Sequence, residues 1–223
     1  MLTGIYDFLS TMITYIPRFL PGVLKTLQLS VFSILLGSVI GLFSTMLKLS
    51  NRKVLMGISS AYVSLIRGTP LLLLLIFIFY GLPSTGLMLD RFPSAVLGLA
   101  FHNGAYISEI FRGSIQSIDI GQREAALSLG MNKAQTMRRI ILPQAFKRSV
   151  PSLGNQFIIA IKDSSLASTI TITEIIMLTR QYSSANWNVF PIYTVAAGYY
   201  LVITLGLSKV LAHVEERLKV NER

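Results

Sequence analysis

Long apolar stretches separated by short polar segments run along most of the chain. They cover residues 20–47, 54–80, 92–111, 150–173 and 190–211. A helix needs about 20 residues to cross the hydrocarbon core of a bilayer, and each of these stretches reaches that length. The pattern therefore predicts an all-α integral membrane protein with five transmembrane helices, organised as a single transmembrane domain over residues 1–223.

Two of the stretches carry irregularities, and a further apolar segment precedes them. The second is interrupted by Arg67-Gly68-Thr69-Pro70, and the apolar run after Pro70 is too short to cross alone, so we expect a kink at this proline. Gly37 and Gly41 in the first stretch either allow another helix to approach closely or are chance glycines. Residues 5–16 are apolar at helical spacing and are expected to lie on the membrane surface. They lack the basic start and cleavage site of a signal peptide.

Composition and charge agree with a membrane protein. Hydrophobic residues make up 52% of the chain and charged residues only 13%, whereas a soluble domain has about 25% charged residues. Most of the 20 Lys and Arg residues fall in the loops after the first and third stretches and in the C-terminal tail. The positive-inside rule then places the N-terminus outside and the C-terminus in the cytoplasm.

The same distribution excludes several other classes of protein. Basic residues spread over three loops without interleaved aromatic side chains do not form a nucleic-acid surface, so we expect no nucleic-acid partner. The chain has no Cys and only two His, which argues against a metal site. Membrane lipid is the expected environment.

The segment 112–149 is the longest polar loop, and it carries helix punctuation. Residues 122–129 favour a helix that stops at Gly130, a residue suited to the left-handed position after a helix. Asn132 then fits an N-cap with Gln135 three positions later, and Pro143 is expected to end the second helix. Such a helical hairpin is either a well-capped solvated loop or a docking element for a cytosolic partner.

This loop also carries a family resemblance. Glu124-Ala125-Ala126, Gly130 and Ile140-x-Leu142-Pro143 resemble the EAA loop of ABC-importer permeases at every defining position. Further segments resemble the polar-amino-acid branch, the histidine, glutamine, arginine and cystine permeases; they are residues 67–70, 105–113, 142–145, 154–155 and 162–166. The resemblance implies a type I ABC importer permease whose cytoplasmic EAA coupling hairpin lies between transmembrane helices 3 and 4.

The resemblance further implies the partners of such a subunit in a bacterial cytoplasmic membrane. A second permease subunit, either identical or a sister chain, completes the path for a polar amino acid. An extracytoplasmic binding protein delivers that amino acid, and cytosolic ABC ATPase subunits dock on the EAA loop and hold ATP and Mg. This chain has no G-x-x-x-x-G-K-[ST] loop, so we expect neither a cofactor nor catalysis here. The implied coupling residues are Glu124 as the polar contact, Ala125 and Ala126 as the close-approach surface, Gly130 as the turn, with Leu142 and Pro143.

Ionisable residues at membrane depth are the candidates for the substrate path, because a charge there is costly. Glu109 lies in the cytoplasmic half of the third stretch, while Lys162 and Asp163 fall in the middle of the fourth. They either contact substrate or pair with each other or with Glu109. Arg67 is either an interfacial anchor at the cytoplasmic end of the second stretch, which we favour, or a gate residue. Neutral candidates on the same stretches are Asn103, Tyr106, Asn155 and Ser164.

Two other functions have to be weighed. An ion- or proton-coupled secondary transporter would leave the docking hairpin unexplained, and five crossings without an internal repeat argue against it. An intramembrane enzyme would need a nucleophile with a base, and no such constellation is assembled along the sequence.

Overall fold

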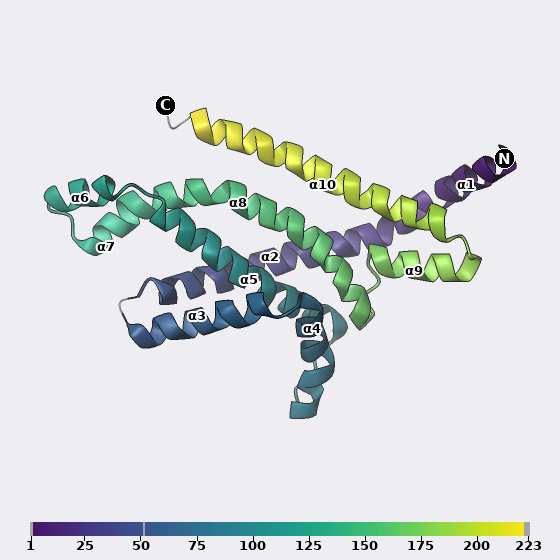
Figure 1. The fold of residues 1–223 in the computed structure, drawn as a ribbon, viewed down its shortest axis with the longest axis horizontal. Coiled ribbons are helices and arrows are strands. Elements are labelled where there is room, and N and C mark those ends of the chain that lie inside the picture. Colours follow the sequence, from purple (N-terminus) through teal and green to yellow (C-terminus); the bar gives the residue numbers. More distant parts are fainter. Residues whose placement is uncertain (1, 51, 221–223) are drawn as a thin grey trace.

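The computed structural model describes residues 2–50 and 52–220, and every regular element in these residues is helical (Figure 1). The α-helices are α1 (Leu2–Tyr15), α2 (Leu20–Lys48), α3 (Lys53–Gly68), α4 (Leu71–Ile76), α5 (Arg91–Gln116), α6 (Ile120–Ser128), α7 (Lys133–Thr136), α8 (Leu142–Asp163), α9 (Ile175–Asn186) and α10 (Val189–Val220). Turns of 3₁₀-helix span Ile16–Phe19, Leu82–Thr85 and Ser164–Ile170, and π-helical turns span Phe77–Gly81 and Met137–Ile141. The predicted all-α class is confirmed.

The predicted spans differ in whether the helix is long and apolar enough to cross a bilayer. Within the described residues, the continuous runs Gly4–Lys48 and Val189–Leu218 are each long and apolar enough to cross a bilayer, and α3 with Leu71–Thr85 passes only as a bent pair. α5 and α8, the other two predicted spans, lie in the middle of the bundle, where they pack on each other and on α2, and α8 also packs on α10 (Figure 1). Because neighbouring helices cover much of their surface, small and polar residues are tolerated in them.

The N-terminal segment is helical and leads directly into the first predicted span. α1 continues through the 3₁₀ turn into α2 as one run of 45 residues, and its place on the membrane surface stays a prediction. α1 is held against α10, where the rings of Phe8 and Phe190 lie 5.5 Å apart and the Tyr199 hydroxyl donates to the carbonyl oxygen of Ile16 at 2.7 Å. These contacts with α10, which is distant in the sequence, hold α1 in its orientation relative to the bundle.

α2 and α5 approach closely at the paired glycines. A Cβ atom on Gly37 would lie 3.1 Å from the carbonyl oxygen of Ala100, and one on Gly41 would lie 2.8 Å from the Ile107 side chain. A larger residue at either position would push the two helices apart. The close-approach interpretation of the glycine pair is confirmed, and chance is excluded.

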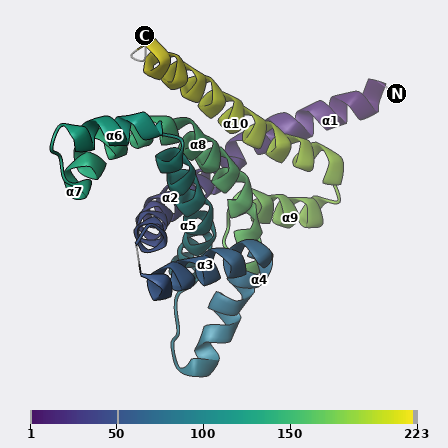
Figure 2. The same ribbon diagram turned by 60° about the vertical axis from the view of Figure 1, so that its left-hand side comes forward.

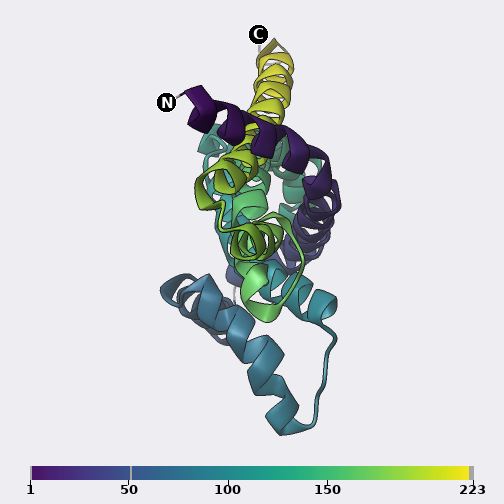
Figure 3. The same cartoon turned by 90° about the vertical axis from the view of Figure 1, so that its right-hand side faces the viewer.

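The kink expected at Pro70 is a sharp bend. The axes of α3 and of the segment Leu71–Thr85 differ by 105°. Thr69 and Pro70 have extended backbone, with ψ of 135° at both residues, as the steric effect of a proline on the preceding residue requires. α4 and the turns after it therefore extend away from the main bundle (Figures 2 and 3).

Candidate functional site

The hairpin predicted between the third and fourth spans is formed by α6 and α7 at one end of the bundle (Figure 1). α6 begins at Ile120 because the side chain of Asp119 caps it, accepting a hydrogen bond from the Gly121 N–H at 2.7 Å. This cap was not predicted from the sequence, although an Asp directly before a helical stretch is its usual signal. The helix therefore starts two residues earlier than expected.

α6 ends in a Schellman motif centred on Gly130. The N–H of Met131 donates to the carbonyl oxygen of Ala126 at 3.1 Å, and the N–H of Gly130 donates to that of Leu127 at 3.0 Å. Gly130 has φ of 81°, a conformation that glycine adopts without the steric penalty of a Cβ atom. Its predicted role as the turn residue is confirmed.

α7 begins with the predicted capping box. The Gln135 N–H donates to the Asn132 side chain at 2.9 Å, and the Asn132 N–H donates to the Gln135 side chain at 3.0 Å. The prediction that Pro143 ends this helix is wrong. α7 passes through the π-helical turn into α8, where Pro143 occupies the first turn. The π turn has already left the normal α-helical hydrogen-bond pattern, so the missing N–H of proline costs little there.

The hairpin exposes part of the EAA motif and buries the rest. Glu124, Ala125, Leu142 and Pro143 are exposed, whereas Ala126 is only 4% exposed. Ala126 therefore belongs to the interior of the hairpin, in contrast to its expected place on the close-approach surface. The base of the hairpin is fixed by an apolar cluster formed by Ile115, Ile118, Ile141 and Ala145.

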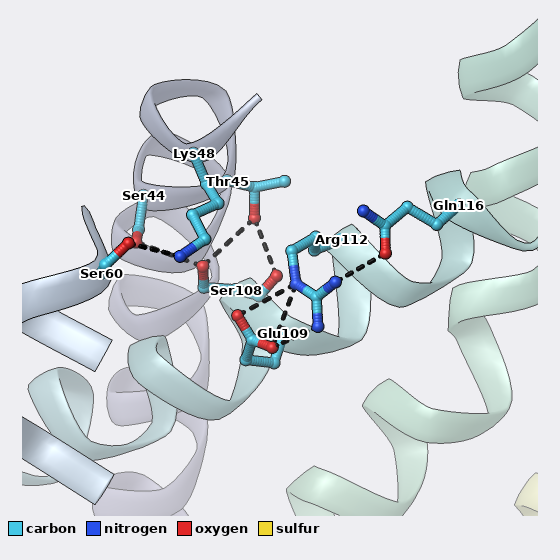
Figure 4. Close-up of polar contacts among 8 residues, drawn as sticks. All are labelled: Ser44, Thr45, Lys48, Ser60, Ser108, Glu109, Arg112 and Gln116. Carbon is cyan, nitrogen blue, oxygen red and sulfur yellow. Dashed lines mark hydrogen bonds and ion pairs between the residues drawn. The ribbon is translucent and has the colours of Figure 1, made fainter. Parts of the chain in front are cut away.

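A cluster of hydroxyl groups joins α2, α3 and α5; Figure 4 shows its members Ser44, Thr45 and Ser108. The Ser44 and Ser59 hydroxyl oxygens lie 2.9 Å apart, and the Ser108 hydroxyl donates to that of Ser44 at 3.1 Å. Thr45 donates to the backbone oxygen of Ser108 at 3.0 Å. All four side chains are buried, so these bonds satisfy polar groups that lipid could not satisfy.

Glu109 lies beside this cluster and forms an ion pair on its own helix (Figure 4). Its Oε2 atom is 2.6 Å from a guanidinium nitrogen of Arg112, and Arg112 also donates to the Gln116 side chain at 2.6 Å. Glu109 is thus paired with Arg112, and no ion pair with Lys162 is present among the described residues. The Lys48 amino group donates to the Ser60 hydroxyl nearby.

Arg67 and Tyr106, two residues of the predicted path, are brought together at the bend of the second span. The Arg67 guanidinium lies over the Tyr106 ring, 5.1 Å from its centroid, and the ring of His102 lies 5.0 Å from that of Tyr106. Arg67 is in the last turn of α3 and Tyr106 is in α5, so the anchor and gate roles of Arg67 both stay predictions. The exposed guanidinium ends α3 directly before the bend.

Asn103 lies in a helix interface. It is fully buried, donates to the backbone oxygen of Leu99 at 2.8 Å and accepts from the Gln156 side chain at 2.9 Å. Gln156 was missed in the sequence, where nothing distinguishes it from the neighbouring Asn155. Asn155 is exposed on α8, so the two adjacent amides face different surroundings.

Lys162, Asp163 and Ser164 lie at the end of α8, where the α-helix changes into a 3₁₀ helix. The middle of a regular span was expected. Lys162 is exposed, Asp163 is partly buried, and Ser164 is buried and donates to the backbone oxygen of Ile161 at 2.8 Å. Two residues of opposite charge therefore lie where the α-helix changes into a 3₁₀ helix.

Glu174 is a buried carboxylate that the sequence analysis did not single out. It is fully buried and caps α9, accepting from the N–H groups of Ile176 and Met177 at 2.8 and 2.7 Å. The hydroxyl of Tyr200 on α10 donates to it at 3.1 Å. An acidic residue directly before an apolar helix was the available signal for the cap, but its link to α10 could be seen only in the fold.

Known proteins share both the sequence and the fold of this chain. The L-cystine transport system permease protein TcyB of Bacillus subtilis is 42% identical, over 88% of this chain and 85% of its own length. The glutamine transport system permease protein GlnP of Escherichia coli is 38% identical, over 92% and 94%. A chain from the crystal structure of an amino acid ABC transporter with histidines superimposes with a TM-score of 0.90 at 40% identity, over 95% of this chain and 98% of that one.

A more distant structure shares the fold alone. A chain of the MetNI methionine ABC transporter, in an inward-facing conformation, superimposes with a TM-score of 0.77 at 20% identity, over 89% of this chain and 94% of that one. Residues 33–220 also match the binding-protein-dependent transport system inner membrane components. This match covers α3 to α10 and most of α2, including the hairpin and the bent span. The chain therefore belongs to the family of binding-protein-dependent transport system inner membrane components.

Proposed function

We propose that this chain is the permease subunit of an ABC importer that moves a polar amino acid into the cytoplasm, driven by ATP hydrolysis in separate subunits docked on the α6–α7 hairpin. The observation that carries the proposal is a short helix capped at both ends that exposes Glu124 and Ala125 at one end of the bundle. Its caps fix the geometry of the docking face before a partner binds. Binding to such a preorganised surface loses less conformational entropy.

The names of the relatives support the substrate class. TcyB is an L-cystine permease and GlnP a glutamine permease, and both substrates are amino acids with polar side chains. We infer a substrate of this class delivered by an extracytoplasmic binding protein, as the family description implies. ATP and Mg belong to the ATPase subunits in this proposal, and a second permease subunit, identical or related, completes the path.

The orientation follows from the position of the hairpin. The hairpin and the C-terminal part of α10 lie toward one end of the bundle, and α1 begins at the other (Figure 1). If the hairpin meets cytosolic subunits, the C-terminus is cytoplasmic and the N-terminus is outside. The excess of Lys and Arg in the loops at the hairpin end supports this orientation.

Two pairs of residues in the proposed path lie near irregular backbone. Arg67 and Tyr106 meet at the bend of the second span, and Lys162 and Asp163 meet the 3₁₀ turn. An amino acid carries an ammonium and a carboxylate, and broken helices with charges of both signs suit such a substrate. Glu109, Asn155 and Ser164 complete the set, while Asn103 positions α5 against α8 through Gln156.

Transport measurements test the proposal. The chain, a related ATPase and a related binding protein are reconstituted in liposomes, and uptake of glutamine, arginine, histidine and cystine is compared. We expect uptake of at least one of them that requires ATP inside and persists with an uncoupler. Uptake without the ATPase that an uncoupler abolishes would instead establish an ion- or proton-coupled transporter.

A second set of variants separates substrate contact from structural support. We expect Asp163→Asn and Lys162→Met to raise the KM for uptake while the thermal unfolding temperature stays near that of the wild type. Lys147→Met on the same helix, at an exposed position outside the path, is the control. A fall in stability with an unchanged KM would assign the Lys162–Asp163 pair a structural role.

A further inference from the structure

A cavity of about 500 Å³ lies between the hairpin and the adjoining ends of α2 and α5. Its walls include the two cations Arg123 and Lys133 and five apolar side chains, which are Leu49, Ile115, Leu127, Met137 and Ile141. Arg123 comes from α6 and Lys133 from α7. A ligand held between the two cations would therefore connect the two helices of the hairpin.

The charge of the cavity is entirely positive. None of its lining residues is acidic, and neither Arg123 nor Lys133 forms an ion pair within the part of the chain that the structure describes. Of the carboxylates on the adjoining helices, Asp119 caps α6 and Glu109 is paired with Arg112, and Glu124, next to Arg123, does not line the cavity. The cavity thus combines two uncompensated cations with an apolar wall, which is complementary to an amphiphile with an anionic head group.

The position of the cavity agrees with a lipid ligand. Leu49 directly follows the last residue of α2, and Ile115 lies in the last turn of α5. The cavity is therefore at the level where the membrane-embedded helices end. Leu127 on α6 and Leu129 directly after it are 41% and 84% exposed, so the hairpin also presents apolar surface at this end. Basic pockets between helices on the cytoplasmic side are typical sites for acidic lipid head groups.

We propose that this cavity binds an anionic phospholipid of the cytoplasmic leaflet, with its phosphate between Arg123 and Lys133 and the upper part of an acyl chain against the apolar wall. The assignment to the cytoplasmic leaflet rests on the proposed function. The bound lipid connects α6 to α7 and the hairpin to the membrane. It would hold the angle of the docking face, and ATP hydrolysis by the assembled transporter would depend on anionic lipid.

The test is a titration of the purified full-length chain in neutral detergent with dioleoylphosphatidylglycerol or with dioleoylphosphatidylcholine. The thermal unfolding temperature is measured at each lipid concentration. We expect only the anionic lipid to stabilise the wild type saturably. The double variant Arg123→Gln/Lys133→Gln should bind it about 30-fold more weakly, because each basic residue near an anionic lipid surface contributes about 1 kcal/mol and a tenfold change is about 1.4 kcal/mol.

Arg138→Gln/Arg139→Gln is the matched control, because it removes two exposed charges from the same hairpin outside the cavity. It should keep the wild-type response. If the anionic lipid stabilised the two double variants equally, the proposal would be overturned in favour of general attraction between the lipid and the positive charge of the protein. The same stabilisation by sn-glycerol 3-phosphate would overturn it in favour of a soluble anion.

Retention of the ATPase during purification is measured in parallel. We expect the Arg123→Gln/Lys133→Gln variant to retain it. Loss of the ATPase with an unchanged lipid response would assign both cations to the ATPase interface and overturn the lipid site. An ATPase that fails to bind even the wild type would contradict the proposed function, while the lipid titration on the chain alone would still decide the cavity.

Discussion

The hairpin and the bundle interior stabilise their polar groups in different ways. The helix caps of the hairpin use local bonds: the Gly121 N–H donates to Asp119, the Gln135 N–H donates to Asn132, and the turn at Gly130 closes over six residues; one longer bond joins Gln144 to Gln122 at 3.3 Å. The bonds that join helices of the bundle are distant in sequence, because Thr45 donates to Ser108 and Gln156 donates to Asn103, 63 and 53 residues apart. The hairpin can therefore keep its shape while it moves as a unit, whereas the interior bonds exist only when the helices are packed.

The largest expected effect comes from the interior. Glu174→Ala removes the acceptor of two backbone N–H groups and of the Tyr200 hydroxyl. Each buried donor left without a partner costs about 1–3 kcal/mol, so we expect the free energy of unfolding to fall by about 3 kcal/mol or more. Thermal unfolding in detergent measures it. Asp90→Ala is the control, since Asp90 also precedes a helix but its side chain makes no capping bond; equal losses would contradict the assigned role.

The next effect concerns the contact of α2 with α5. A Cβ atom in Gly41→Ala would lie 2.8 Å from Ile107 and 2.9 Å from the backbone oxygen of Gly104. Overpacking of this kind costs about 1–3 kcal/mol, and uptake should fall with stability. Gly57→Ala, where a Cβ atom meets nothing within 4 Å, should be neutral or slightly stabilising. A neutral Gly41→Ala variant would show that the helices separate easily.

Substitutions in the hairpin turn should affect ATPase binding more than the stability of the bundle. Gly130 has open space around it and a φ of 81°, so Gly130→Val is penalised only by its backbone conformation, by about 1–2 kcal/mol. We expect loss of ATPase binding with little change in the unfolding temperature of the bundle. Gly130→Asn should largely keep ATPase binding, because Asn tolerates the left-handed region better. Equal loss in both variants would point to a contact of the side chain instead of the turn conformation.

The smallest expected effect is that of the capping box. Asn132→Ala removes the acceptor of the Gln135 N–H, and loss of an N-cap costs about 1 kcal/mol. The cost should appear as faster hydrogen exchange confined to α7, with a modest fall in ATP-driven uptake. A change in exchange across α5 or α8 would show that the hairpin and the interior are coupled more tightly than their hydrogen bonds indicate.

The sequence by itself determined the features that depend on neighbouring residues. Apolar length predicted the helical class, Pro70 predicted the break in the second span, and Asn132 and Gly130 predicted the capping box and the turn. Steric and hydrogen-bonding preferences act over a few residues, so they are encoded locally. The same locality explains the error at Pro143, since a π-helical turn before it changes what proline does to the helix.

Only the tertiary structure decided which distant groups meet. It placed Arg67 on Tyr106, buried Asn103 against Gln156 and joined Glu174 to Tyr200. It also made α1 continuous with α2 and placed Arg123 and Lys133 around one cavity. An ionisable residue in an apolar span predicts only that some partner must satisfy its charge. Which partner satisfies them depends on the register and rotation of packed helices, and these are set by side-chain volumes along the whole bundle.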